Sequence, residues 1–487
     1  MKKVLAVAML LLMSAGIAAA AEEASWLEIG GDYQFRYDHL AGKIHDYMQY
    51  TGSAANGFVP GPGGIRIFST GVSGYDVKND SLMTNRFGLH LKAKATEDVT
   101  VKARLDMYKI WGNETTDPNF YSPEKSGAFD GNSTHIPEDN TVRVDYAYAT
   151  WSNIGGVPAW FSVGRRPSTG GSPSNLRANT EKSGTAGVPS FLIDYAFDGM
   201  TFGYAPDINA LPGAYAKLCY GRGYESGYDH HQDNSPNSLK DVDMIGINIV
   251  PFDTTKLHVE LQYDRAYHMM SNPPVSAFGA VQANIGDIEQ VGALVMGKVD
   301  KAGPGDFNWF ASFGMSKTHP NDNGYQLPFF DQGSAATTAN AKFGLLYDDP
   351  NFGGVKESHT GSAFYIGARY DLPSRTKIGL EYNQGSKFWI AFAPAADDMI
   401  ASKVGTRGSV YEVYVIQELN QTAISKNGKA FFKLTYQYYD FAYTGSNGWL
   451  GAPKKISELD KNNPLNTQMY PVLDTASDIY LTFNVTF

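Results

Sequence analysis

The feature that most constrains this chain is an alternation of apolar and polar residues that returns in one segment after another. In residues 82–95, the odd positions Phe87, Leu89 and Leu91 are apolar, whereas the even positions His90 and Lys92 are polar. A period of two puts one kind of side chain on each face of a β-strand. Repeated segments of about ten such residues are typical of strands that cross a membrane with one face toward lipid and one toward the lumen.

Sixteen segments carry this pattern. They are 26–38, 82–95, 99–110, 141–152, 159–166, 191–206, 213–222, 241–250, 256–267, 287–300, 306–317, 361–372, 376–389, 408–419, 429–443 and 476–487. Short and long connections alternate between them. The sequence therefore predicts an all-β fold, a transmembrane antiparallel up-and-down β-barrel of about sixteen strands. We expect short periplasmic turns, long extracellular loops and both termini in the periplasm.

One segment changes parity. Phe191, Ile193 and Tyr195 occupy odd positions, whereas the apolar residues after Asp198–Gly199 occupy even ones. We interpret the shift as a β-bulge at Asp198–Gly199, because glycine readily adopts the backbone angles that a bulge needs. A hairpin at the same place is the alternative. The bulge is preferred because it preserves the alternation of long and short connections.

The first segment differs from the rest. Lys2 and Lys3 precede an apolar run that ends in small residues at Ala18–Ala21, which predicts a signal peptide over 1–21 and a single outer-membrane barrel domain over 22–487. No later run is long and apolar enough for a spanning helix. A mean hydropathy of -0.30 agrees with a barrel, in which apolar and polar residues average out.

Charge and cysteine content exclude several classes of function. The net charge is -10, and a nucleic-acid partner would normally require a basic surface. The single cysteine, Cys219, excludes a disulfide scaffold and a CxxCH haem site. No phosphate-binding or dinucleotide fingerprint is present. We therefore predict no catalytic residues, no metal and no cofactor.

The last segment alternates up to its final residue, Phe487. Here the chain resembles Gram-negative outer-membrane proteins, whose last strand commonly ends in Phe and is read by the barrel assembly machinery. Residues Asn85–Trp111 and Ser162–Arg177 resemble more narrowly a poorly characterised family of porin-like outer-membrane proteins. The resemblance implies a location in the outer membrane, with its lipids and the assembly machinery as partners. It implies neither a substrate nor catalytic residues.

A barrel of sixteen strands leaves room for water. The residues predicted to face that lumen include a basic set on neighbouring strands and carboxylates elsewhere: Arg86, His90, Lys92, Lys102, Arg104, Arg143 and Arg166, with Asp32, Glu260 and Glu381. A symmetric turn at 96–98 would place Lys92 opposite Lys102 and His90 opposite Arg104. Two interpretations remain open, a mutually neutralising wall network and a transverse field with one basic side.

Residues 167–190 form the third long loop and are the best candidate for a constriction. They carry Arg177, Asn175, Asn179 and Glu181 among Pro, Gly and Ser. An ordinary surface loop is the alternative. Tryptophans near strand ends are candidates for the aromatic girdles at headgroup level: Trp26, Trp111, Trp151, Trp160, Trp309 and Trp389. Trp160 fits less well because its parity is that of the lumen.

These observations predict a passive porin for small hydrophilic solutes or ions, with no reaction catalysed and a homotrimer as a plausible assembly. The alternative is a structural sheath around a partner such as an electron-transfer cytochrome. A third hypothesis is an enzyme or adhesin that acts through the outer loops, for which His230 and His231 are the residues to test.

Overall fold

The computed structural model describes residues 26–52, 59–60, 66–112, 135–168, 170–184, 187–227, 239–271, 282–331, 338–393, 398–419, 422–425 and 427–487. The predicted signal peptide lies outside these residues. So do His230 and His231. No helix among the described residues is long and apolar enough to cross a membrane.

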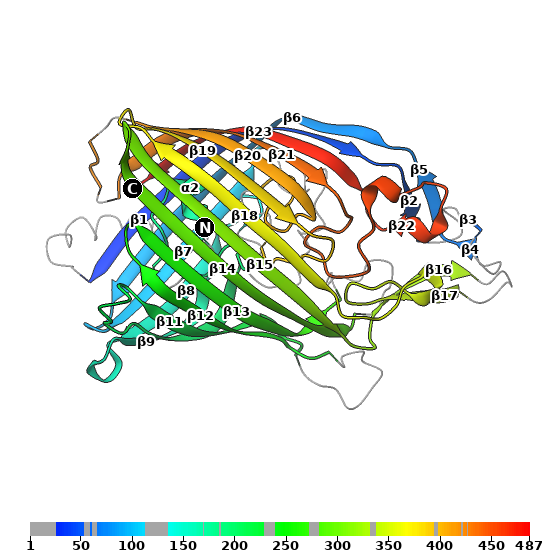
Figure 1. The fold of residues 1–487 in the computed structure, drawn as a ribbon, viewed down its shortest axis with the longest axis horizontal. Helices are drawn as coiled ribbons and strands as arrows, with labels where there is room; N and C mark the ends of the chain where they lie inside the picture. Colours follow the sequence, from blue (N-terminus) through cyan, green and yellow to red (C-terminus); the bar gives the residue numbers. More distant parts are fainter. Residues whose placement is uncertain are drawn as a thin grey trace, which may run out of the picture.

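Sixteen antiparallel strands close into one barrel (Figure 1). They are β1 (Leu27–Ile44), β6 (Tyr75–Lys94), β7 (Val99–Ile110), β8 (Arg143–Ser152), β9 (Ala159–Pro167), β10 (Ala196–Tyr204), β11 (Tyr215–Tyr224), β12 (Val242–Asp253), β13 (Leu257–Met270), β14 (Asn284–Ala302), β15 (Gly305–Pro320), β18 (Thr360–Asp371), β19 (Thr376–Gly385), β20 (Gly408–Glu418), β21 (Lys429–Phe441) and β23 (Leu473–Thr486). Each follows its neighbour in chain order, and β1 pairs with β23 to close the ring. Each predicted segment corresponds to one of these strands, which confirms the fold class and the strand number.

Smaller elements extend from the barrel at the end opposite the C-terminus (Figure 1). One sheet contains β2 (Tyr47–Tyr50), β5 (Ser69–Val72) and β22 (Thr467–Gln468). The other contains β3 (Val59–Pro60), β4 (Arg66–Ile67), β16 (Tyr325–Asp331) and β17 (Thr338–Phe343). The one α-helix among the described residues is α2 (Ser174–Ala178); short 3₁₀ helices lie at Ile154–Gly156, Pro350–Phe352, Ile456–Glu458 and Pro464–Asn466.

The outer face of the barrel is apolar. Every barrel strand contributes at least one large exposed hydrophobic side chain: Ile29, Phe87, Val101, Val144, Val163, Met200, Leu218, Ile245, Leu261, Val291, Phe313, Ile366, Leu380, Val413, Leu434 and Leu481. Such a continuous surface would be unfavourable in water and suits the hydrocarbon of a bilayer.

The predicted bulge at Asp198–Gly199 is wrong. Strand β10 pairs with β9 and with β11 in continuous register through both residues, which also excludes the hairpin. The apolar residues Phe191 and Ile193 belong to the preceding loop and are buried inside the barrel. Their parity differs from that of β10 because they are not part of a strand.

The predicted girdle tryptophans differ in exposure. Trp26, Trp111 and Trp151 are about half exposed, as residues of a girdle would be, and Trp309 on β15 is partly exposed. Trp160 is buried on the inward face, in agreement with its parity. Trp389 was predicted as part of a strand and as a girdle candidate, but β19 ends at Gly385 and Trp389 is fully buried inside the barrel.

Candidate functional site

Two long loops fold into the barrel and pack on each other there. Loop 3 (residues 168–195) follows β9, and loop 7 (residues 386–407) follows β19. The backbone N–H of Asp194 donates to the carbonyl of Phe392 at 2.7 Å, and the N–H of Phe392 donates to the carbonyl of Leu192 at 2.7 Å. These segments are the most buried apolar part of the molecule. They fill the lumen beside β13, β14 and β15.

Two glycines of the barrel wall, Gly292 on β14 and Gly314 on β15, leave space for these loops. A Cβ built on Gly292 would lie 2.5 Å from the side chain of Leu192, and one built on Gly314 would lie 2.8 Å from the indole of Trp389. Such distances are well inside van der Waals contact. The two glycines, on β14 and β15, therefore admit loops 3 and 7 to the interior.

A buried network of charges joins both loops to β19 and β20. The Nζ of Lys403 donates to Glu412 Oε2 at 2.5 Å and also contacts Glu381. The Nη1 of Arg177 donates to Asp398 at 2.9 Å and to Glu412 at 3.3 Å. Burial alone would lower the pKa of the Arg177 guanidinium, but its two carboxylate partners raise that pKa well above the usual range. Each basic side chain of this network is therefore paired with carboxylates in the interior.

Loop 3 also reaches the end of the barrel where the short turns lie. The side-chain amide of Asn179 donates to Glu418 at 3.0 Å, and Lys377 donates to the Asn179 side chain at 2.7 Å. The ammonium group of Lys429 donates to the backbone carbonyl of Asn179 at 2.8 Å. These partners stand next to the turns that follow β18 and β20. Loop 3 thus runs from one end of the lumen to the other and is fixed at both, so the alternative of a plain surface loop is wrong.

The basic row on β6 and β7 lies four to six strands around the ring from β19 and β20, which carry this network. The register places His90 opposite Arg104 and Lys92 opposite Lys102, as predicted. Arg104 contacts Asp32 at 3.0 Å, and it also contacts Asp106 and Asp145. Arg86 pairs with Asp106 at 2.7 Å, His90 with Asp32 at 2.5 Å, and Lys92 with Glu28 at 3.2 Å. This part of the wall is a mutually compensating network.

Solvent reaches this row. The side chains of Glu28, His90 and Lys92 are 48%, 41% and 37% exposed on the inward face. The inward carboxylates Glu381 on β19 and Glu412 on β20 are 2% and 1% exposed. Lys102 is half-buried and makes no ion pair within the described part of the chain. One accessible charged surface on the inward face therefore lies on β1, β6 and β7.

The remaining predicted residues are dispersed. Arg143 binds Glu138 and Asp139 next to its own strand end. Glu260, on β13, accepts from Asn248 at 2.8 Å and contacts His258 at 3.2 Å. Arg166 bonds the Ser162 hydroxyl at 2.9 Å. These residues, Arg177 and Glu381 do not join the row on β6 and β7.

Sequence reasoning missed the contribution of loop 7. Lys403 and Asp398 were assigned to an ordinary outer loop, as was Arg407, which donates to the backbone carbonyl oxygens of Trp389, Gly445 and Gly448. One signal was available. The run Phe388–Ala393 contains no charged residue and is too apolar for a loop in water.

A family model described as "Protein of unknown function (DUF3373)" matches residues 76–487. The chain belongs to this family. The match spans all barrel strands except β1, as well as loops 3 and 7. It agrees with the resemblance of Asn85–Trp111 and Ser162–Arg177 to a poorly characterised porin-like family. No curated protein matches the chain.

Similar solved structures are outer-membrane barrels. "Salmonella typhi OmpF complex with Daunomycin" is 11% identical with a TM-score of 0.41, over 94% of this chain and 97% of that one. "Anion-selective porin from Comamonas acidovorans" is 9% identical with a TM-score of 0.40, over 95% and 99%. The Vibrio cholerae outer membrane protein OmpT, in a trimer form, is 10% identical with a TM-score of 0.40, over 95% and 100%. This likeness is too distant to transfer a solute, a selectivity or an assembly state to the DUF3373 protein.

No group of three or more His, Cys, Asp or Glu suited to a metal ion occurs among the residues that the structure describes. The prediction of no metal and no cofactor stays a prediction, as does the absence of catalysis.

Proposed function

We propose that the protein is an outer-membrane channel through which ions or small hydrophilic solutes diffuse along the inward face of β1, β6 and β7. One observation carries the proposal: charged inward side chains are solvent-accessible there, whereas Glu381 on β19 and Glu412 on β20 are sealed beneath loops 3 and 7. A lumen so narrowed would have a small conductance. Charged groups at close quarters would set its selectivity.

The test is single-channel recording on the refolded protein under a salt gradient. The double variant Lys92→Gln/Lys102→Gln removes two adjacent positive charges from the accessible row. The reversal potential should move toward the value for cations, because the carboxylates of Glu28 and Asp32 stay in place. Lys256→Gln, at a short turn where the side chain is 74% exposed, is the matched control and should leave it unchanged.

A folded barrel that gives no conductance would contradict the channel. A reversal potential unaffected by the double variant would contradict the assigned path.

The structure does not favour the cytochrome sheath. A partner inside the barrel would have to displace loops 3 and 7, including the buried contacts of Arg177 and Lys403. Co-purification of a haem protein with the native barrel would restore this alternative. Recognition of Phe487 by the assembly machinery and assembly into a homotrimer stay predictions.

A further inference from the structure

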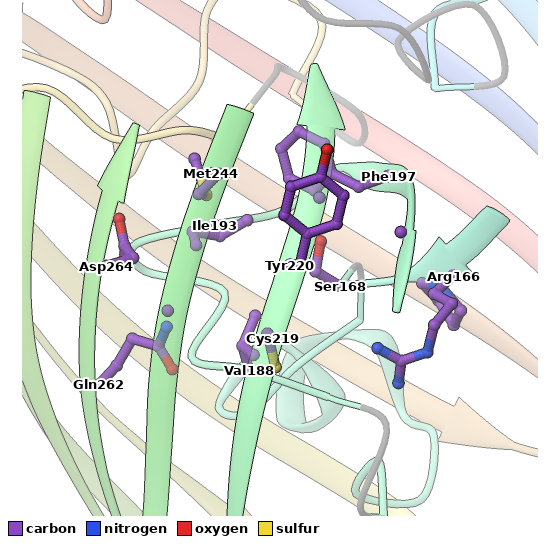
Figure 2. Close-up of a pocket in the computed structure, with 14 residues that line it drawn as sticks. Arg166, Ser168, Val188, Ile193, Phe197, Cys219, Tyr220, Met244, Gln262 and Asp264 are labelled. Carbon is purple, nitrogen blue, oxygen red and sulfur yellow. The ribbon is translucent and has the colours of Figure 1, made fainter. Parts of the chain in front are cut away.

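The wall contains a cavity of about 60 Å³ beside loop 3, on β9 to β13 (Figure 2). It is lined in part by glycines at inward positions of three neighbouring strands: Gly199, Gly221 and Gly246. A cavity of this volume holds more than one water molecule.

The middle of the cavity is apolar, whereas an acidic and a basic side chain stand at its two ends. Val188 and Ile193 of loop 3 line it together with Phe197 and Met244. Figure 2 shows Asp264 and Arg166 on opposite sides, with Cys219 between them. An apolar passage between one anion and one cation is the environment of an organic ligand that carries both charges.

Asp264 is fully buried, and neither of its carboxylate oxygens has a hydrogen-bond partner among the described residues. Removing a carboxylate from water without a compensating partner is costly. Its neighbour in register is Gly246, and the side-chain amide of Gln262 lies beside that glycine. No cationic side chain among the described residues pairs with Asp264.

Arg166 is the complementary group. Its Nε donates to the Ser162 hydroxyl and its Nη1 to the Thr201 hydroxyl, and it forms no ion pair with any carboxylate in the described part of the chain. Thr201, Cys219, Gly246 and Asp264 follow one another in register across four strands. Three strand spacings amount to roughly 14 Å, which sets an upper scale for the distance between the two charged groups.

We propose that this cavity binds a small zwitterionic organic molecule, with its ammonium group at Asp264, its carboxylate at Arg166 and an apolar spacer across Cys219. The ammonium and the carboxylate of the ligand would then pair with the acidic and the basic side chain at the same time. Binding does not depend on conduction, so this proposal and the proposed channel function can fail separately.

Cys219, the sole cysteine, provides the measurement. It lines the cavity, is half-buried and is not in a disulfide. The probes are ε-aminocaproate, which has both charges, and hexylamine and caproate, which have one each. On the folded, detergent-solubilised full chain, ε-aminocaproate should slow alkylation of Cys219 by iodoacetamide at concentrations at least tenfold lower than either single-charge probe.

Two variants assign the ends. Asp264→Asn should remove the advantage of ε-aminocaproate over caproate, and Arg166→Gln its advantage over hexylamine. Glu28→Gln, a lumen carboxylate outside the cavity, should change neither. Equal protection of wild-type Cys219 by ε-aminocaproate and caproate, or no protection by any probe, overturns the proposal without the need for a variant. Protection that persists in folded Asp264→Asn also overturns it.

Discussion

At the scale of single residues, Lys403 is the most demanding feature of the molecule. Its ammonium group is 2% exposed and lies between two carboxylates that are equally buried. Taking three charges out of water is favourable only while all of them remain together. Lys403 therefore holds loop 7 against β19 and β20, and removing any one of the three charged groups would leave the others buried without a partner.

We predict that Lys403→Met destabilises the barrel by about 3–5 kcal/mol, the usual cost of leaving buried charges without a partner. Glu381 and Glu412 would then repel each other in a low dielectric. Urea unfolding in lipid vesicles measures the change. Lys455→Met is the control, because its pair with Glu458 is exposed and should matter little. A loss as small as that of the control would contradict the role assigned to Lys403.

The residue scale also shows what a sequence can and cannot indicate. The facing of Lys92 and Lys102 was predictable, because a short turn and the period of two together fix the register. The contact of Lys403 with Glu381 was not, since it depends on the path that loop 7 takes through the lumen. Local periodicity contains no information about that path.

At the scale of elements, loop 3 decides how much of the lumen is open. Arg177 attaches it to Asp398 of loop 7, and Asn179 attaches it to Glu418 at the end of β20. Its apolar residues Phe191 and Leu192 hold it against β14 and β15. Loop 3 thereby occupies part of the lumen and leaves only part of the inner wall accessible to solvent.

We predict that replacing residues 172–192 with a short Gly-Ser linker increases single-channel conductance several-fold, because the lumen of a sixteen-stranded barrel is wide once it is empty. Removal of the β16–β17 hairpin is the matched control. That hairpin packs in a separate apolar cluster beyond the barrel, so conductance should stay the same. An unchanged conductance after loop 3 is replaced would show that the conducting path lies elsewhere.

The elements differ in how well sequence predicts them. All sixteen strands were found, because each presents an apolar face to lipid along its length. The ends were less certain. Phe191, Ile193 and Trp389 were assigned to strands because they are apolar, yet they are buried where loops 3 and 7 pack on each other. An apolar segment indicates that its side chains avoid water, but it does not indicate whether they face lipid or the protein interior.

At the scale of the whole molecule, the outer surface is matched to a bilayer. Leu434, near the middle of β21, is 52% exposed on that surface. We predict that Leu434→Arg costs about 2–4 kcal/mol of folding free energy in bilayers, because the guanidinium would face hydrocarbon. Leu434→Ala separates the effect of charge from the loss of the side chain. If the two variants cost the same, this strand does not face lipid.

The pairing of β1 with β23 has a consequence for biogenesis. Asp32 is in register with Thr486, and Gly31 exchanges backbone hydrogen bonds with Phe487 at 2.8 and 2.9 Å. The first strand of the barrel to leave the ribosome therefore waits for the last residues of the chain before one of its edges is covered. The barrel therefore cannot close while the chain is still being synthesised from its N-terminus. Until the barrel closes, its unpaired edges would be open to self-association, so the chain depends on being kept apart from other copies before β1 pairs with β23.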